Sequence, residues 1–533
     1  MRRRLPSERT SAVCAVVAVV AILLWHGVRA AASGWIPTGD DAYFTLRSLD
    51  VLGEHHPLLG AWSAGSVDLD RHVNNLGPMQ LDLLAPFTRV AWAGGTAIGV
   101  VAVHSMAVLA IAWLSYRLGG ARQVVASMVA VALLSWVMGS QLLITPQQHQ
   151  YLVPTYLATL VATWSAAVGD RWAPLVFVGA GSLALQTHLT YPVLIVPLAL
   201  VVIVGQAIAW RTRPDDHPAY TTAWAVTVGV GVLLWTQTLV DQFFGQGNVG
   251  DVLTAPSQAE SPGLVAGARL SADVLLSSRG YLRPGMADFD PSVSTGSRLE
   301  TVALLALWLA LVGLAVLAVR RGRHRTSAGL AVAAVAVAAA VVNAALIPES
   351  EFFGLRPESY RWLWPTAAFL VLGAASWAIR RGGATSTSAA VGLAVVLAWS
   401  VVNVPRSYQV AQPDGYRASE QAVADVVGQL LDRLPAMDLE GPVVVVQQEM
   451  YLGHRFAYPL GIVVRELGLD YRFEGAGQAR RFGAERVADG SEPTRLVLRH
   501  GEAAAARFDA PDTVAYTAGA VPVSVTLERD SAP

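Results

Sequence analysis

The sequence predicts an α-helical polytopic membrane protein with a small C-terminal α/β domain outside the membrane. Of its 533 residues, 53% are hydrophobic and 14% are charged, whereas soluble globular proteins carry about 25% charged residues. Apolar runs long enough to cross a bilayer recur as far as position 404. From 405 onward the runs shorten and alternate with polar residues, which is typical of a water-exposed domain. We therefore expect two units, 1–404 and 405–533.

Eleven apolar segments approach the roughly 20 residues that a spanning helix needs. They are residues 11–31, 97–116, 124–144, 151–168, 173–189, 192–210, 221–240, 299–319, 327–347, 363–379 and 387–404. Those between 151 and 210 follow one another so closely that one of them could be short or re-entrant. The first segment also has features of a signal peptide, but the many later spans favour an uncleaved first helix.

The arginines predict the orientation of these helices. The chain has no lysine, and 15 of its 38 basic residues lie on six short segments beside helix ends: 2–9, 117–122, 171, 211–213, 320–325 and 380–381. Because positive charge beside spans is retained in the cytoplasm, we expect the N-terminus inside and the C-terminus outside the cytoplasmic membrane. The longer segments 32–96 and 241–298 and the tail 405–533 are then extracytoplasmic.

The tail has the pattern of a mixed α/β unit. Amphipathic spacing predicts helices at 416–434 and 453–469, and apolar runs predict strands at 441–448, 494–500 and 522–529. A formal net charge of −1 gives no reason to expect a nucleic-acid partner. The single Cys14 excludes an intrachain disulfide and a cysteine-based metal cluster.

Two adjacent carboxylates, Asp40 and Asp41, begin an expected interfacial helix where the first span emerges, in GWIPTGDDAYFTLRSLDVLGEHH. Thr38 or either aspartate could cap that helix. A cap needs only one of them, and a carboxylate at a membrane exit can also act as general base or hold a cation. From the residues alone both interpretations stay open. His55 and His56 would point about 100° apart on a helix, so they are not expected to share one metal ion.

Three further segments carry a resemblance to a known family. They are LDLLAPF (81–87), TPQQHQYLVPTYLATLVATW (145–164) and SLALQTHLTYPVL (182–194). With the acid pair, they resemble the C-type superfamily of integral membrane glycosyltransferases, in an actinobacterial-type form.

The resemblance implies an activity and roles for the acid pair. It implies inverting transfer of a sugar from a polyprenyl-phosphate donor to a hydroxyl of a cell-envelope glycan, lipid or protein. Asp40 would act as general base, and Asp41 would orient the acceptor or hold a divalent cation, whose involvement stays open. The segment Asn75-Leu76-Gly77-Pro78 departs from the family pattern, which has His-Pro where Leu76 stands. His56 or His72 could take the place of that histidine.

The leaving phosphate needs a positive partner, for which arginine has the best geometry. The candidates are Arg356 and Arg361, beside Tyr360, and less so Arg71; interfacial anchoring is the alternative for these residues. His149 and His188, at predicted external helix ends, are candidates for substrate binding or for structural roles.

Two loop segments are weaker candidates for the site. The D-x-D of Asp68 and Asp70 is more typical of a solvated loop. The segment 279–290 could form an acceptor-binding flap or only a surface loop.

Two other functions remain open at this stage. A transporter or flippase of a lipid-linked envelope precursor would favour ionisable residues in mid-membrane and inverted repeats, and the expected spans are almost free of Asp, Glu and Arg. A non-catalytic protein that binds envelope glycans through its tail is the second alternative.

Overall fold

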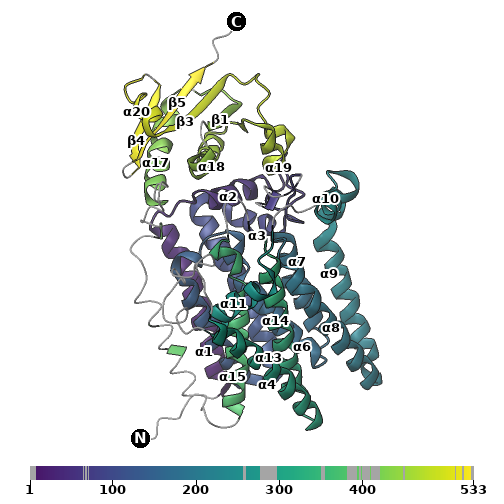
Figure 1. The fold of residues 1–533 in the computed structure, drawn as a ribbon. Coiled ribbons are helices and arrows are strands. Elements are labelled where there is room, and N and C mark those ends of the chain that lie inside the picture. Colours follow the sequence, from purple (N-terminus) through teal and green to yellow (C-terminus); the bar gives the residue numbers. More distant parts are fainter. Residues whose placement is uncertain are drawn as a thin grey trace.

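A bundle of long helices carries a small sheet domain at one end in the structure, a computed structural model (Figure 1). The first described helix, α1, begins at the end of the bundle away from the sheet (Figure 1). The structure describes residues 8–63, 65–66, 69, 71–255, 260–276, 297–349, 355–380, 393–394, 398, 408–409, 420–437, 439–447, 450–510, 512–518 and 521–529.

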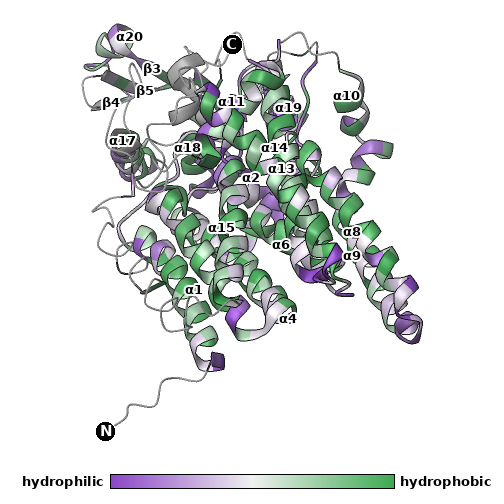
Figure 2. Ribbon diagram, turned by 60° about the horizontal axis from the view of Figure 1, so that its bottom comes forward, coloured by the Kyte–Doolittle hydropathy of each residue, from purple (hydrophilic) through white to green (hydrophobic). Residues whose placement is uncertain are grey.

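Seven helices of the described residues are long and apolar enough to cross a membrane. They are α1 (Glu8–Ala32), α4 (Trp92–Leu142), α8 (Pro192–Thr212), α9 (His217–Phe244, preceded by the 3-10 turn η2, Pro214–Asp216), α13 (Arg298–Arg320), α14 (His324–Leu346) and α15 (Leu363–Arg380). Hydrophobic residues cover these helices along most of their length, and hydrophilic residues gather at their ends (Figure 2). This is the arrangement of a multi-pass membrane protein.

The helices differ in detail from the eleven expected spans. α4 covers two of them, and its backbone breaks at Gly119 and Gly120, where φ is −159° and 71°. α6 (Val153–Ala167) and α7 (Ala173–Thr187) have 15 residues each and are therefore about 22 Å long, shorter than a hydrocarbon core of about 30 Å. The expected span 387–404 lies almost entirely outside the described residues. Eleven spans and the cytoplasmic N-terminus remain predictions.

Shorter helices fill the connections between the long ones. They are α2 (Asp40–Asp50), α3 (Met79–Thr88), α5 (Gln148–Tyr151), α10 (Asn248–Thr254), α11 (Gly263–Leu276) and η4 (Pro357–Tyr360). α11 lies inside the segment expected to be a loop and packs against α14 and α13. Gly267 makes this packing close, because a Cβ there would stand 2.6 Å from the backbone nitrogen of Ala345.

The C-terminal unit is a five-stranded mixed sheet with helices, which confirms the expected helices and strands of the tail. Strands β2, β1 and β3 are parallel, and β5 and β4 are antiparallel, in the order β2-β1-β3-β5-β4. The elements are α17 (Glu420–Arg433), η5 (Leu434–Ala436), β1 (Val443–Gln447), α18 (Met450–Glu466), β2 (Tyr471–Phe473), η6 (Ala476–Gln478), α19 (Ala479–Phe482), η7 (Ala484–Arg486), β3 (Thr494–His500), α20 (Gly501–Ala505), β4 (Thr513–Ala518) and β5 (Val521–Arg529).

α2 belongs to the core of this sheet unit as well as to the first loop. Residues 42–50 of α2 are all buried. Tyr43, Phe44 and Leu46 pack in one apolar cluster with side chains of α18 and of the strands. The sheet unit therefore fixes the helix on which the acid pair stands.

Candidate functional site

The acid pair opens α2 without capping it. Gly39 is the N-cap, with φ 54° and ψ −128°, and no side chain forms a capping hydrogen bond. The expected caps, Thr38 or one of the aspartates, are therefore absent, and the physical reason is the left-handed backbone at Gly39, a conformation that glycine adopts without strain. Asp40 and Asp41 lie in the first turn of α2, where carboxylates suit the positive end of the helix dipole, so only the capping part of that explanation is wrong.

The two carboxylates have different surroundings. Asp40 is exposed, and within the described part of the chain its carboxylate forms no hydrogen bond or ion pair. Asp41 is partly buried and interacts electrostatically with Arg361. Asp40 is thus accessible to a ligand, whereas Asp41 faces a cation from a segment more than 300 residues away in the sequence.

Arg361, which follows η4, is held in position by α5. Its guanidinium donates a hydrogen bond to Oε1 of Gln150 and interacts electrostatically with Glu358. Nε2 of Gln150 donates to Thr145 Oγ1 (2.8 Å) and to Gln147 Oε1 (2.9 Å). These bonds fix the amide of Gln150 so that its oxygen faces the arginine.

His149 of α5 and His188, which directly follows α7, meet beside this arginine. Their ring centroids are 4.5 Å apart, and Nδ1 of His188 lies 2.9 Å from Thr190 Oγ1. Nδ1 of His149 is buried and has no hydrogen-bond partner among the described residues. Burial, followed by the charges of His188, Arg361 and Arg356, holds the pKa of His149 well below its ordinary value of 6.5. His149 is therefore neutral at pH 7 and keeps a polar atom for a ligand.

The lowered pKa of His149 predicts acid sensitivity. As pH falls through about 6.5, the unfolded chain binds a proton that the folded chain does not, so the folded state loses up to about 1.4 kcal/mol per pH unit. His149→Gln removes this loss. We expect the difference in melting temperature, variant minus native chain, to increase as the pH is lowered from 7.5 to 5.5. Thermal unfolding of both proteins in detergent measures it, and a difference that stays constant with pH would contradict the prediction.

Arg356 and Asn75 interact with parts of the same group, and Tyr360 is buried directly before Arg361 in the sequence. Arg356 lies 3.7 Å from Glu358 and acts electrostatically on His149. Tyr360 is 1% exposed. Asn75 accepts a hydrogen bond from the backbone nitrogen of Leu189 (3.1 Å) and donates to Ala61 O (2.9 Å), so it ties the first loop to the residue after His188.

His56 lies in a different hydrogen-bond network. Its Nδ1 accepts from Leu52 N (3.0 Å), so its Nε2 carries the proton and donates to Gln237 Oε1 (3.1 Å). Gln237 in turn donates to Asp82 Oδ2 (2.8 Å). The interfacial helix was expected to continue to His56, but α2 ends at Asp50 and Leu52 has a positive φ of 59°. The substrate-binding role of His56 stays a prediction.

The side chain of His55 contacts the C-terminal unit. Its ring lies 3.4 Å from Glu485 and 3.9 Å from Asp470. The two adjacent histidines thus contact different parts of the molecule.

The C-terminal unit adds side chains that sequence reasoning did not find. Asp40 acts electrostatically on the hydroxyls of Tyr43 and Tyr458. Tyr458, on α18, accepts a hydrogen bond from Arg481, whose backbone oxygen accepts from Tyr43 (3.0 Å). The only signal in the sequence was an aromatic residue within a predicted amphipathic helix, which is far more often a core residue.

The remaining sequence candidates are not in this group. Arg71 pairs with Asp251 at 3.2 Å, and His72 accepts from Trp62. Asp68, Asp70 and the segment 279–290 lie outside the described residues. In the part of the chain that the structure describes, no three His, Cys, Asp or Glu side chains gather as metal ligands would. A divalent cation at the acid pair stays a prediction.

Comparison with known proteins finds weak likenesses of fold. The chain is similar to ArnT from Cupriavidus metallidurans bound to undecaprenyl phosphate, with 15% identity over 98% of this chain and 99% of that chain and a TM-score of 0.42. It is also similar to the Archaeoglobus fulgidus oligosaccharyltransferase in complex with Zn and sulfate, with 11% identity over 91% and 67% of the two chains and a TM-score of 0.40.

A third solved structure is the A. fulgidus oligosaccharyltransferase AglB in complex with an inhibitory peptide and a dolichol-phosphate. It has 12% identity over 92% of this chain and 69% of that chain, and a TM-score of 0.40. No family model and no curated protein matches the chain. Likenesses this weak do not decide function, which has to be inferred from the chain's own residues.

Proposed function

We propose that this chain is a membrane glycosyltransferase. It moves a sugar from a polyprenyl-phosphate donor to a hydroxyl of a cell-envelope acceptor on the extracytoplasmic side, with inversion at the anomeric carbon. The observation that carries the proposal is the start of α2, where an accessible carboxylate that caps no helix stands beside one that faces Arg361. The resemblance of the segments around 40, 149 and 188 to the C-type superfamily supports the same activity.

In the proposed reaction Asp40 is the general base. The acceptor oxygen forms a bond to the anomeric carbon while the bond from that carbon to the phosphate oxygen breaks. The hydroxyl proton passes to the Asp40 carboxylate, and the electron pair of the broken bond leaves with the polyprenyl phosphate. Arg361 stabilises the added negative charge on that phosphate, for which its planar fork is suited.

The remaining side chains position the reactants. Gln150 accepts a hydrogen bond from the guanidinium of Arg361, and Asp41 interacts electrostatically with it. The neutral His149 has an unpaired nitrogen that can bind a sugar hydroxyl. Such pre-arranged groups lower the barrier because they need no reorganisation during the reaction.

An Asp40→Asn variant tests the proposal. The purified full chain is incubated in detergent with a panel of polyprenyl-phosphate hexoses and pentoses and with cell-envelope extract as acceptor, and released polyprenyl phosphate is measured. We expect the variant to release it about 10²–10⁴-fold more slowly than the native chain, the usual contribution of a general base. Glu54→Gln, which changes an exposed carboxylate of the same loop, is expected to keep the native rate.

Other outcomes separate the alternatives. Full activity in Asp40→Asn would overturn the assignment of the base. A native chain that releases no phosphate from any donor, but moves a labelled lipid across proteoliposomes, would be a transporter. Binding of envelope glycan without turnover would indicate a non-catalytic role.

A further inference from the structure

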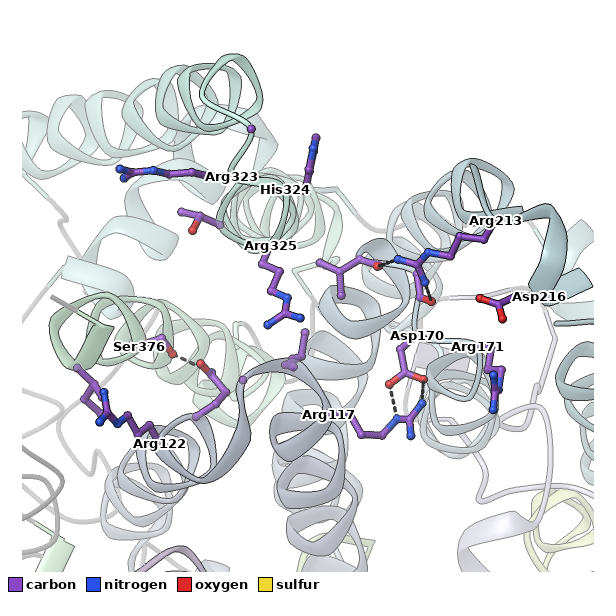
Figure 3. A pocket seen from close by; sticks show the side chains of 18 of the residues that line it. Arg117, Arg122, Asp170, Arg171, Arg213, Asp216, Arg323, His324, Arg325 and Ser376 are labelled. Atoms are coloured by element: carbon purple, nitrogen blue, oxygen red, sulfur yellow. Dashed lines mark hydrogen bonds and ion pairs between the residues drawn. The ribbon is translucent and has the colours of Figure 1, made fainter. Parts of the chain in front are cut away.

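The side chains drawn in Figure 3 line a cavity, which has a volume of about 920 Å³. This cavity lies at the end of the helices opposite to the acid pair. Its position is clear from α7: Arg171, just before that helix, lines the cavity, whereas His188 directly follows the helix at its other end. Its walls come from the break in α4, the starts of α7 and α9, the turn between α13 and α14, and α15. Ligand pockets typically have volumes of about 300–1,000 Å³.

Positive charge dominates the lining. Six arginines and two aspartates contribute to it: Arg117, Arg122, Arg171, Arg213, Arg323, Arg325, Asp170 and Asp216. The carboxylate of Asp170 is already paired, because both of its oxygens accept hydrogen bonds from Arg117. Arg122 pairs with Glu8, and Arg213 donates to Gly169 O (2.9 Å) and to Tyr220 Oη (3.0 Å).

Three of these arginines have no such partner. In the described part of the chain, the side chains of Arg171, Arg323 and Arg325 form no hydrogen bond or ion pair. Figure 3 shows the guanidinium of Arg325 extending into the middle of the group of labelled side chains. Cations around one partly enclosed space repel one another more than they would in open water, so a bound anion would stabilise the arrangement.

The backbone holds Arg325 in this position. Gly322, with a φ of 67°, ends α13 and turns the chain, and Arg323 N donates to Ala318 O (2.8 Å). The backbone oxygen of Arg325 then accepts a hydrogen bond from Trp164 Nε1 (2.9 Å) on α6. Arg325 is therefore anchored across two helices and not only placed at a helix end.

We propose that this cavity binds a phosphate-bearing anion, and that the phosphate is the headgroup of a membrane phospholipid. The guanidinium fork matches two phosphate oxygens, and the unpaired arginines supply several forks. Buried Leu118 and Ile379 also line the cavity and offer apolar contacts to the part of a lipid below its headgroup. The site is independent of the proposed transferase chemistry at the other end of the helices.

Phosphatidic acid and inorganic pyrophosphate are the probes for the two sources of phosphate. The full chain is purified in a neutral detergent, and binding of each probe is measured by native mass spectrometry and by thermal unfolding, with phosphatidylcholine as the lipid control. We expect saturable binding of phosphatidic acid. Arg325→Ala and Arg171→Ala should each weaken it about tenfold or more, because a charge-assisted hydrogen bond is lost. Arg321→Ala, an exposed arginine of the same turn outside the lining, should bind as the native chain does.

Each remaining outcome has a definite meaning. Binding of pyrophosphate but not of phosphatidic acid would keep the phosphate site and overturn its lipid source. Binding of neither probe, or an equal loss in Arg321→Ala and Arg325→Ala, would overturn the site and leave only general attraction by positive charge. If Arg325→Ala does not fold, Arg171→Ala is compared with Arg321→Ala in its place.

Discussion

An Arg361→Ala variant is expected to transfer sugar about 10²–10³-fold more slowly than the native chain, the cost of removing one pre-arranged group that stabilises transition-state charge. Arg361 is the cation that Asp41 faces, and Gln150 holds it in place. In the proposed reaction, the negative charge that develops on the leaving phosphate would then have lost its partner. Release of polyprenyl phosphate measures the effect, and saturation with donor separates slower chemistry from weaker donor binding.

Two further variants test whether the slower transfer comes from the loss of the Arg361 guanidinium. Arg361→Lys keeps the charge but not the fork, so it should recover only part of the rate. Arg298→Ala removes an exposed arginine at the start of α13 and should leave the rate unchanged. If Arg361→Ala were as fast as the native chain, the arginine would serve only to anchor η4 at the membrane surface.

The second large effect concerns stability. Asp50→Ala is expected to destabilise the junction of α2 with the sheet unit by about 3–5 kcal/mol, because the buried Arg47 loses its counter-charge and the buried Arg486 retains only Asp470 as a carboxylate partner among the described residues. Asp50 is 3% exposed and accepts hydrogen bonds from Arg47 (2.7 Å) and from Tyr471 (3.1 Å). Arg486, 4% exposed, lies 3.4 Å from its other oxygen. Thermal unfolding in detergent and protease sensitivity of the sheet unit measure the loss.

An exposed ion pair provides the control for the Asp50→Ala variant. Glu474→Gln breaks an ion pair with Arg495 in the same unit, in which the two side chains are 52% and 30% exposed. Exposed pairs of this kind contribute about 0–1 kcal/mol, so the melting temperature should hardly change. Equal effects of the two substitutions would mean that the junction does not depend on Asp50.

Much of the fold could be predicted from local pattern. The apolar strand around Val443, the amphipathic helices of the tail and the helix that begins at Asp40 all follow from spacing along the chain. The limits of that reasoning appear where local and tertiary structure differ. α2 ends at Asp50 and not at His56, whereas the non-helical backbone at Gly119 and Gly120 falls between two expected spans, 97–116 and 124–144, as the sequence predicts.

The candidate site could be predicted only in part. Sequence reasoning selected Asp41, His149, His188 and Arg361, and the structure brings these four together. It did not find Gln150, because a glutamine becomes informative only once its partner, 211 positions away, is known. Contacts at such separations come from the packing of helices, which composition and periodicity do not encode.

The burial of α2 against the sheet unit affects how the chain is made. α2 begins at Asp40, and α18, on which it packs, begins at Met450. At about 5–20 residues per second, translation separates the two by roughly 20–80 s. During that interval the apolar face of α2 has no α18 to cover it, so the membrane surface or a chaperone has to shield it. The acid pair acquires its final surroundings only after α18 has left the ribosome.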